Sequence, residues 1–170
     1  IYFTDRQGYD FDSGTSFASP YVAGAVAILR SQGYSVNETI ARLLVGARPK
    51  AYSEGKVVLT GNLDVARAMS ATPRPFLVPQ NKGIYPALWN RTTNTADLGI
   101  ELKNIWKDAR SVKARLSLSV RDASLAQLRI VTPTFAFKGW KSGEVKSLET
   151  AIQILDPKVT SDATLILEIA

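Results

Sequence analysis

The chain has 170 residues, enough for one ordinary domain or two small ones. Hydrophobic residues make up 45% and charged residues 21%, which excludes collagen-like, low-complexity and wholly disordered proteins, and no run of about 18 apolar residues is present to span a bilayer. The net charge is +6, and the lack of cysteine and histidine excludes disulfides, thiolate catalysis and imidazole as a general base within these residues.

The start of the chain carries no signal-peptide pattern and no initiator methionine, so we expect an excerpt from a longer polypeptide. Residues 1–4 predict a short strand and residues 5–14 a polar loop. Residues 16–31 have helical spacing but are apolar nearly all round. Such a helix is typical of the interior of a larger structure.

Residues 35–46 predict a second helix, this one amphipathic. Ser35 followed three positions later by Glu38 is a capping box. We expect the apolar face of this helix to consist of Ile40, Leu43 and Leu44.

A short strand is predicted at residues 57–59, and Asn62 is predicted to cap a short helix that runs to Met69. Three prolines within residues 73–79 then disfavour helix and indicate an extended linker or an edge strand. We therefore place a boundary at this point. The expected organisation has three parts, namely residues 1–72, a Pro-rich linker at 73–82 and a second domain at 83–170.

Beyond the boundary the apolar residues alternate with polar ones, which predicts β-strands. The clearest runs are residues 98–102, 112–120, 145–155 and 164–169. Strands that follow one another without helices indicate an antiparallel sandwich. The predicted fold is thus an α/β fragment followed by an all-β antiparallel sandwich.

The charge is concentrated in the second part. Through Thr72 there are 7 Lys and Arg against 6 Asp and Glu, and from Pro73 onward 14 against 9, so the net charges are +1 and +5. A basic module suits anionic polysaccharide, nucleic acid or lipid, but these cations alternate with apolar residues, which favours a solvated sheet face. No aromatic-basic signature of nucleic-acid binding is present, so no nucleic-acid partner is expected.

Three tryptophans, Trp89, Trp106 and Trp140, follow the boundary. If exposed they would form a carbohydrate-stacking surface. Aromatic residues of an all-β module more often belong to its core, and we expect that here.

The chemistry is concentrated in residues 12–24, DSGTSFASPYVAG. A serine in the first turn of a helix lies beside backbone N–H groups without helical partners and beside the positive end of the helix dipole, which suits a developing oxyanion. Gly14 lets a substrate backbone approach closely, and we expect Pro20 in the first turn, where its missing N–H costs little. A bare Gly-Thr-Ser triplet would more often mean that Ser16 caps a core helix.

The longer string GTSxAxPxVAG, at residues 14–24, closely resembles the nucleophile segment of the subtilisin-like serine proteases. The resemblance covers about the first 70 residues. It implies that Ser16 attacks the scissile carbonyl and lends its N–H to the oxyanion hole, while Gly14 and Thr15 line the substrate approach. Two positions depart from the usual family string, Phe17 for methionine and Tyr21 for histidine.

In this family the catalytic Asp and His precede the Ser in sequence, so the resemblance places both in a missing upstream segment. It implies a secreted or periplasmic serine endopeptidase that acts on protein or peptide substrates without a cofactor. We expect these 170 residues alone to be inactive. The rival function is a non-catalytic binding or adhesion module, in which the sandwich recognises protein or polysaccharide.

Three further expectations concern partners and ligands. Asp10 and Asp12 would suit a metal or an acid/base pair, but no third ligand is near in sequence, so we expect no metal. The second part weakly resembles Ig-like or CARDB-type modules through residues 94–104. The apolar helix, without the strands that normally cover it, would be exposed, so we expect self-association, packing onto the sandwich, or an upstream chain that holds it.

Overall fold

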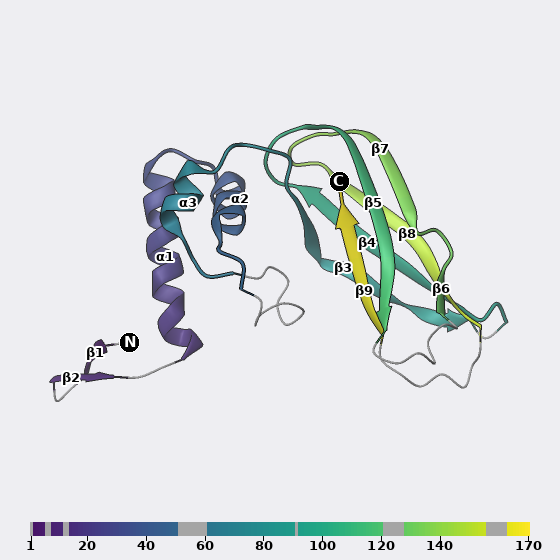
Figure 1. Cartoon of the computed structure of the whole chain (residues 1–170), viewed down its shortest axis with the longest axis horizontal. Helices are drawn as coiled ribbons and strands as arrows, with labels where there is room; N and C mark the ends of the chain where they lie inside the picture. The colour runs from purple at the N-terminus through teal and green to yellow at the C-terminus, as the bar shows by residue number, and fades with distance from the viewer. Residues whose placement is uncertain are drawn as a thin grey trace. The chain divides into compact units, whose positions relative to one another are not determined.

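The computed structural model describes residues 2–5, 8–11, 14–50, 61–90, 92–120, 128–155 and 163–170. It divides into two compact units, Ile1–Thr72 and Pro73–Ala170 (Figure 1). The described part of the first unit consists of helices and a small hairpin, and that of the second consists of antiparallel strands. An α/β beginning followed by a β-rich region is therefore what the structure shows. None of the described helices is long and apolar enough to cross a membrane.

The first unit begins with a hairpin and continues with helices. Its described elements are β1 (Tyr2–Asp5), β2 (Gly8–Phe11), α1 (Thr15–Ser31), α2 (Val36–Gly46) and α3 (Val65–Ser70). The prediction of a loop at residues 5–14 is wrong, because β2 pairs with β1 in antiparallel register. Gly8, at φ 135°, starts the return strand in a conformation that favours glycine. A strand of four residues is too short to show a period in the sequence.

The helix α1 begins at Thr15, one residue earlier than predicted. Pro20 is therefore its sixth residue and lies beyond the first turn, so the Ser16 carbonyl lacks the N–H that would otherwise reach it. Only Ala25 and Leu29 of this helix are buried, whereas the Tyr21 side chain is 61% exposed. Within this chain α1 contacts α2, and most of its other residues are exposed, as expected of this helix without the strands that would cover it.

The cap predicted for α2 is confirmed, because Ser35 Oγ accepts a hydrogen bond from the Glu38 N–H at 3.1 Å. The Glu38 carboxylate binds Arg42 Nε at 3.0 Å. The apolar face predicted for this helix is partly wrong. Ile40 is 43% exposed, and the buried residues are instead Thr39, Ala41, Arg42 and Gly46.

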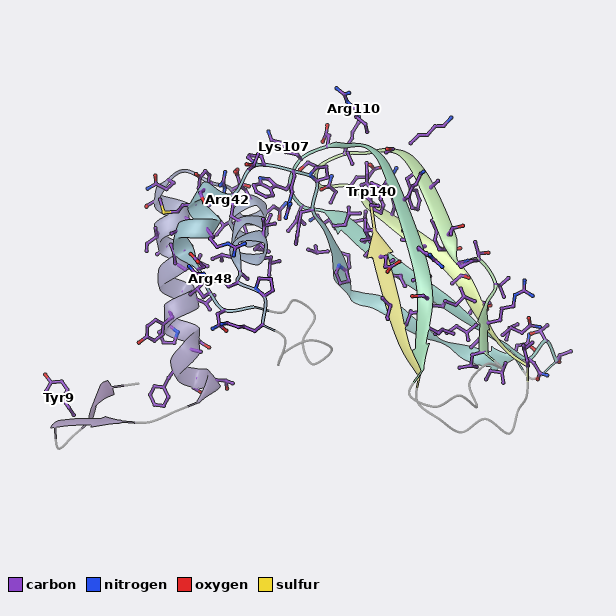
Figure 2. All side chains as sticks on the ribbon, in the orientation of Figure 1. Tyr9, Arg42, Arg48, Lys107, Arg110 and Trp140 are labelled. Carbon is purple, nitrogen blue, oxygen red and sulfur yellow. The ribbon has the colours of Figure 1, made fainter. Side chains whose placement is uncertain are left out.

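The physical reason is the way α3 lies against α2. A Cβ at Gly46 would lie 2.5 Å from the Ala68 nitrogen, so glycine permits the close approach. Arg42 Nη1 donates to the carbonyls at the end of α3 and just beyond, those of Ala68, Met69 and Ala71 at 3.3, 3.0 and 2.9 Å. Its guanidinium also lies 3.9 Å from the Tyr34 ring centre. A charged side chain thus occupies a core position of α2 (Figure 2).

The N-cap of α3 is Asp64 and not Asn62. Asp64 Oδ1 accepts from the Arg67 N–H at 3.0 Å, and Asp64 Oδ2 lies 2.6 Å from Arg48 Nε. Asn62 is held in a β-bridge with Arg48 by two backbone hydrogen bonds of 2.8 and 2.9 Å. The helix therefore starts two residues later than the cap preference of Asn62 indicated.

This cap predicts a pH dependence of stability. The hydrogen bonds from the Arg67 N–H and from Arg48 lower the pKa of Asp64 below its usual 3.8. A depressed folded-state pKa contributes stability above the unfolded value, and this contribution is lost as the pH falls through the folded pKa. In thermal melts from about pH 7 to about pH 2, the difference in Tm between the wild type and Asp64→Asn should therefore close at the acid end. A difference that stays constant with pH would contradict this, and the exposed Asp97→Asn serves as the control.

The second unit consists of two antiparallel sheets. Their strand orders are β3-β4-β8-β6 and β7-β5-β9 (Figure 1). The strands are β3 (Leu77–Asn90), β4 (Thr95–Asn104), β5 (Ala109–Val120), β6 (Leu128–Ile130), β7 (Thr134–Trp140), β8 (Val145–Ile154) and β9 (Ala163–Ile169). The alternating patterns correctly predicted β4, β5, β8 and β9, whereas β6 and β7 were not predicted.

Residues of both sheets form one hydrophobic core. Its buried members are Leu98, Ile100, Leu102, Ala109, Val112, Ala114, Leu116, Trp140 and Leu148. Trp140 is completely buried and Trp106 is 6% exposed, so these two side chains cannot serve as a carbohydrate-stacking surface. The prediction that they are buried is confirmed. The Trp89 side chain lies outside the described residues.

The Pro-rich segment is an edge strand from Leu77 onward and not a linker up to residue 82. Among the described strands β3 pairs only with β4, and its register shifts twice along the way, once after Pro79 and again after Pro86. Proline is tolerated at an edge because it lacks an N–H to donate to a second neighbour.

One buried polar side chain, Asn104, connects three segments of the second unit. Its Oδ1 accepts from the N–H groups of Phe76 and Trp106 at 3.2 and 3.3 Å. Its Nδ2 donates to the carbonyls of Lys107 and Trp140 at 2.6 and 3.0 Å. Asn104 therefore fixes the start of β3, the β4–β5 turn and the end of β7 to one another.

Candidate active-site serine

Ser16 is the second residue of α1, in the first turn, as the motif predicts. Gly14 is the N-cap with an extended backbone, and its carbonyl accepts the Phe17 N–H at 3.1 Å. The side chains of Thr15 and Ser16 are exposed. No acidic residue lies in this first turn, so the positive end of the helix dipole is not offset there by a carboxylate of the helix itself.

The chain brings no imidazole to this serine, because it contains no histidine. Asp10 lies on β2, and Asp12 is outside the described residues. Across the residues that the structure describes, no group of three or more acidic side chains is arranged to hold a metal ion. What the chain supplies is therefore a hydroxyl group at a helix end, without an imidazole to activate it.

Ser19 provides a useful contrast with Ser16. Its hydroxyl lies 3.4 Å from the Thr15 carbonyl, one turn back along α1. The Ser19 hydroxyl thus has a hydrogen-bond acceptor in the preceding turn of α1. Ser16, in contrast, lies at the N-terminal end of the helix. The two serines share exposure and sequence neighbourhood, so Ser19 is a matched control for Ser16.

The side of α1 next to the serine is open within this chain. Six residues line a shallow depression of about 560 Å³ along it, namely Thr15, Ala18, Ser19, Val22, Ala23 and Val26. No heavy atom lies within 4 Å of the place a Cβ would take at Gly24. The Val22 and Ile28 side chains are 45% and 46% exposed. The helix therefore presents apolar and small residues that nothing in the described part of the first unit covers.

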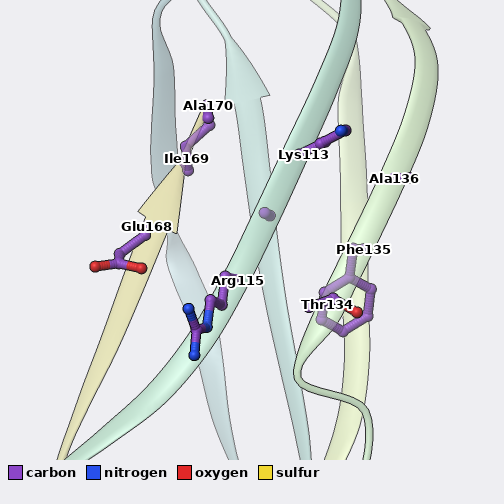
Figure 3. A pocket seen from close by; sticks show the side chains of 9 residues that line it. Lys113, Arg115, Thr134, Phe135, Ala136, Glu168, Ile169 and Ala170 are labelled. Carbon is purple, nitrogen blue, oxygen red and sulfur yellow. The ribbon is translucent and has the colours of Figure 1, made fainter.

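The second unit has a depression that the sequence did not indicate. It measures about 530 Å³ and crosses β7, β5 and β9 (Figure 3). Arg115 and Glu168, which are opposite each other in the β5–β9 register, both line it, together with Lys113 and Phe135. Cations and an anion stand side by side there, so this depression does not favour ligands of one charge.

Comparison with known proteins relates part of the first unit to a protease family. Residues 2–66 match the model of the subtilase family, Peptidase_S8. Over 60 residues, or 34% of this chain, the sequence is 38% identical to Mycosin-3 of Mycobacterium tuberculosis (strain ATCC 25618 / H37Rv). The matched stretch spans 13% of that relative. The first unit is thus similar to one part of a subtilisin-like serine protease.

Proposed function

We propose that this chain is the carboxy-terminal part of a subtilisin-like serine endopeptidase, with Ser16 as its nucleophile. The observation that carries the proposal is the place of Ser16, in the first turn of α1 within the stretch that matches the subtilase family. A hydroxyl at the N-terminal end of a helix is suited to attack a carbonyl whose oxygen becomes an anion.

In this mechanism Ser16 Oγ attacks the carbonyl carbon of the scissile peptide bond while a base takes its proton. The Ser16 N–H stabilises the oxyanion, and Gly14 and Thr15 line the substrate approach. The amine then leaves with a proton, and water hydrolyses the acyl-enzyme. The base and the acid that orients it come from an upstream His and Asp, so the 170 residues alone are inactive.

The open side of α1 supports the second part of the proposal, which is that an upstream part of the catalytic domain covers it. The exposed apolar residues Tyr21, Val22 and Ile28 of α1 would be buried by such a covering, and Gly24 would allow close approach of a neighbouring element. We further propose that the parent is secreted or periplasmic. The second unit, Pro73–Ala170 with β3 as an edge strand, is then an Ig-like β-sandwich appended to the catalytic domain.

A fluorophosphonate probe tests the assignment of Ser16. The probe should label the longer polypeptide that carries this chain together with its upstream segment, and Ser16→Ala should abolish the labelling, because the probe reacts with the activated nucleophile. Ser19→Ala, the matched control, should be labelled like the wild type. Labelling that survives in Ser16→Ala would refute the assignment. Absence of labelling in a folded parent would favour the rival, a binding module.

A further inference from the structure

One end of the second unit gathers basic side chains from three segments that are distant in sequence. The segments are residues 73–76, 105–111 and 138–146, and they contain six cations against two acids, a net of +4. The whole unit has a net charge of +5, so this end carries most of it. We call this region the basic end, and its cations are Arg74, Lys107, Arg110, Lys138, Lys141 and Lys146.

Hydrogen bonds hold these segments against one another. The Lys107 N–H donates to the Arg74 carbonyl at 3.3 Å. Asp108 Oδ1 accepts the Ser142 N–H at 2.7 Å. The buried Asn104 side chain bonds to all three segments from within. The fold therefore brings together cations that are scattered in the sequence.

Five of the six cations belong to exposed residues, and Figure 2 shows Lys107 and Arg110 extending away from the strands. Lys146 is the exception. Its Nζ lies 2.7 Å from the Gly139 carbonyl, and its side chain is 23% exposed. The outward charge of this end thus comes from the other five side chains.

The two acids of the basic end do not neutralise these five cations by direct pairing. Asp108 is bonded to the Ser142 N–H, and Glu144 Oε2 accepts the backbone N–H of Lys141 at 2.8 Å. Glu144 Oε1 lies 3.5 Å from Nζ of the inward Lys146. Within the described ranges, neither acid forms an ion pair with an exposed cation of this end. The five positive charges can therefore pair with an external anion.

The residues between the cations are small and polar. Lys107 and Lys141 belong to the β4–β5 and β7–β8 turns. In these two turns, the exposed residues other than lysine are Asp108, Ser142 and Gly143. The centre of a protein interface is normally more apolar than this. An extended anionic surface, in contrast, can contact several cations at once without an apolar centre.

The tryptophans of this end also restrict the partner. Single-stranded nucleic acid is held by bases that stack on aromatic rings, and a carbohydrate surface would use the same rings. Trp106 and Trp140 are 6% and 0% exposed, so they cannot stack on a ligand. The basic end therefore offers charge without stacking, which suits the phosphates of anionic lipid headgroups.

We infer that the basic end binds the surface of a lipid bilayer that contains anionic headgroups. The headgroup phosphates pair with exposed cations such as Arg74, Lys107 and Arg110. Each Lys or Arg near such a surface strengthens binding about fivefold, so the exposed cations together give an increase on the order of a thousandfold. The binding is electrostatic and reversible, and it does not depend on Ser16 or on protease activity.

Co-sedimentation of the 170-residue chain with vesicles tests the inference. One set of vesicles is phosphatidylcholine alone, and the other contains about one third phosphatidylglycerol. Binding to the neutral vesicles reports adsorption through the exposed apolar residues of α1, and the increase on the anionic vesicles reports charge. We expect an increase of about 100-fold or more at about 0.1 M salt, most of which is lost at about 0.5 M. An increase of less than about threefold at the lower salt concentration would overturn the inference.

Variants show whether the charge acts at the basic end. Lys107→Gln combined with Arg110→Gln should reduce the increase about tenfold or more. The control is Arg115→Gln with Arg129→Gln, which removes the same charge from exposed positions roughly 20 Å or more along the strands, beyond the Debye length. The control should reduce the increase by less than about twofold. Equal reductions would show that net charge alone drives binding, and the inference would then be wrong.

Asp108→Asn provides a change in the opposite direction. Asparagine keeps an oxygen that accepts the Ser142 N–H, but it removes a negative charge from the basic end. The variant should bind the anionic vesicles about threefold more tightly. Weaker binding by a variant whose far-UV circular dichroism spectrum is unchanged would contradict the inference.

Heparin and a poly-glutamate peptide, each titrated by fluorescence anisotropy, distinguish a bilayer from polyanions in solution. Suppose that the Lys107 and Arg110 substitutions weaken binding of either polymer about tenfold but leave vesicle binding unchanged. The partner would then be a soluble polyanion, and the inference would be overturned. Vesicle binding that falls in the variant supports it. All of these outcomes leave the assignment of Ser16 unaffected.

Discussion

Replacing Asn104 by leucine should lower the free energy of unfolding of the second unit by about 4 kcal/mol or more. The change removes four hydrogen bonds and leaves two N–H groups and two carbonyls facing an apolar side chain. Each buried polar group left without a partner costs about 1 to 3 kcal/mol, and partial access of water reduces the sum. Leucine has the same branched arrangement of side-chain heavy atoms as asparagine and larger end groups, so the substitution leaves no cavity, and the loss comes from the unpaired polar groups together with any crowding.

Urea unfolding followed by tryptophan fluorescence measures this effect, because Trp106 and Trp140 are buried beside Asn104. The matched control is Asn90→Ala. Asn90 accepts two backbone hydrogen bonds in an exposed turn, at 2.9 and 3.3 Å, and its loss should cost about 1 kcal/mol or less. If both substitutions cost the same, Asn104 does not connect the three segments energetically.

Replacing Arg42 by methionine should destabilise the first unit by about 3 kcal/mol or more. The guanidinium satisfies three carbonyls at the end of α3, pairs with Glu38 at 2.9 Å, and has a 7% exposed side chain. Methionine keeps the apolar stem but leaves those carbonyls and the Glu38 carboxylate without that donor. Lysine should recover only part of the loss, because an ammonium group lacks the planar array of donors.

The measurement is urea unfolding followed at the helical circular dichroism band, since the described helices belong to the first unit. Arg67→Met, on the exposed side of α3, is the control and should change the free energy of unfolding by about 0.5 kcal/mol or less. A loss at Arg42 no larger than at Arg67 would show that the carbonyl contacts contribute little.

The sequence predicted those elements whose signals are local. The Ser35 cap gave the start of α2, and the alternation around Leu98 gave β4. β2 and β6 have four and three residues, too few to show a period, and β3 is interrupted by prolines. In each of these the pairing partner on another strand decides the conformation, and no local pattern encodes that partner.

The polar core residues were missed for a related reason. Counting apolar residues on α2 favoured Ile40, whereas Arg42 is buried because α3 offers it carbonyls from 26 to 29 residues away. Asn104 did leave a signal, since it continues the inward series of Leu98, Ile100 and Leu102 on β4. For the candidate site, the motif placed Ser16 at a helix start, and the structure has it there. The sequence could not indicate a histidine base for Ser16, because the chain contains no histidine.

The prolines of β3 have a consequence for how the protein behaves at high concentration. The outer edge of a sheet can recruit a strand from another molecule and so start fibril growth. On β3, Pro79 and Pro86 have no N–H to offer an incoming strand, and the two register shifts prevent a long straight match. The two prolines that interrupt the alternating pattern of β3 therefore also hinder pairing of this edge with a strand of another molecule.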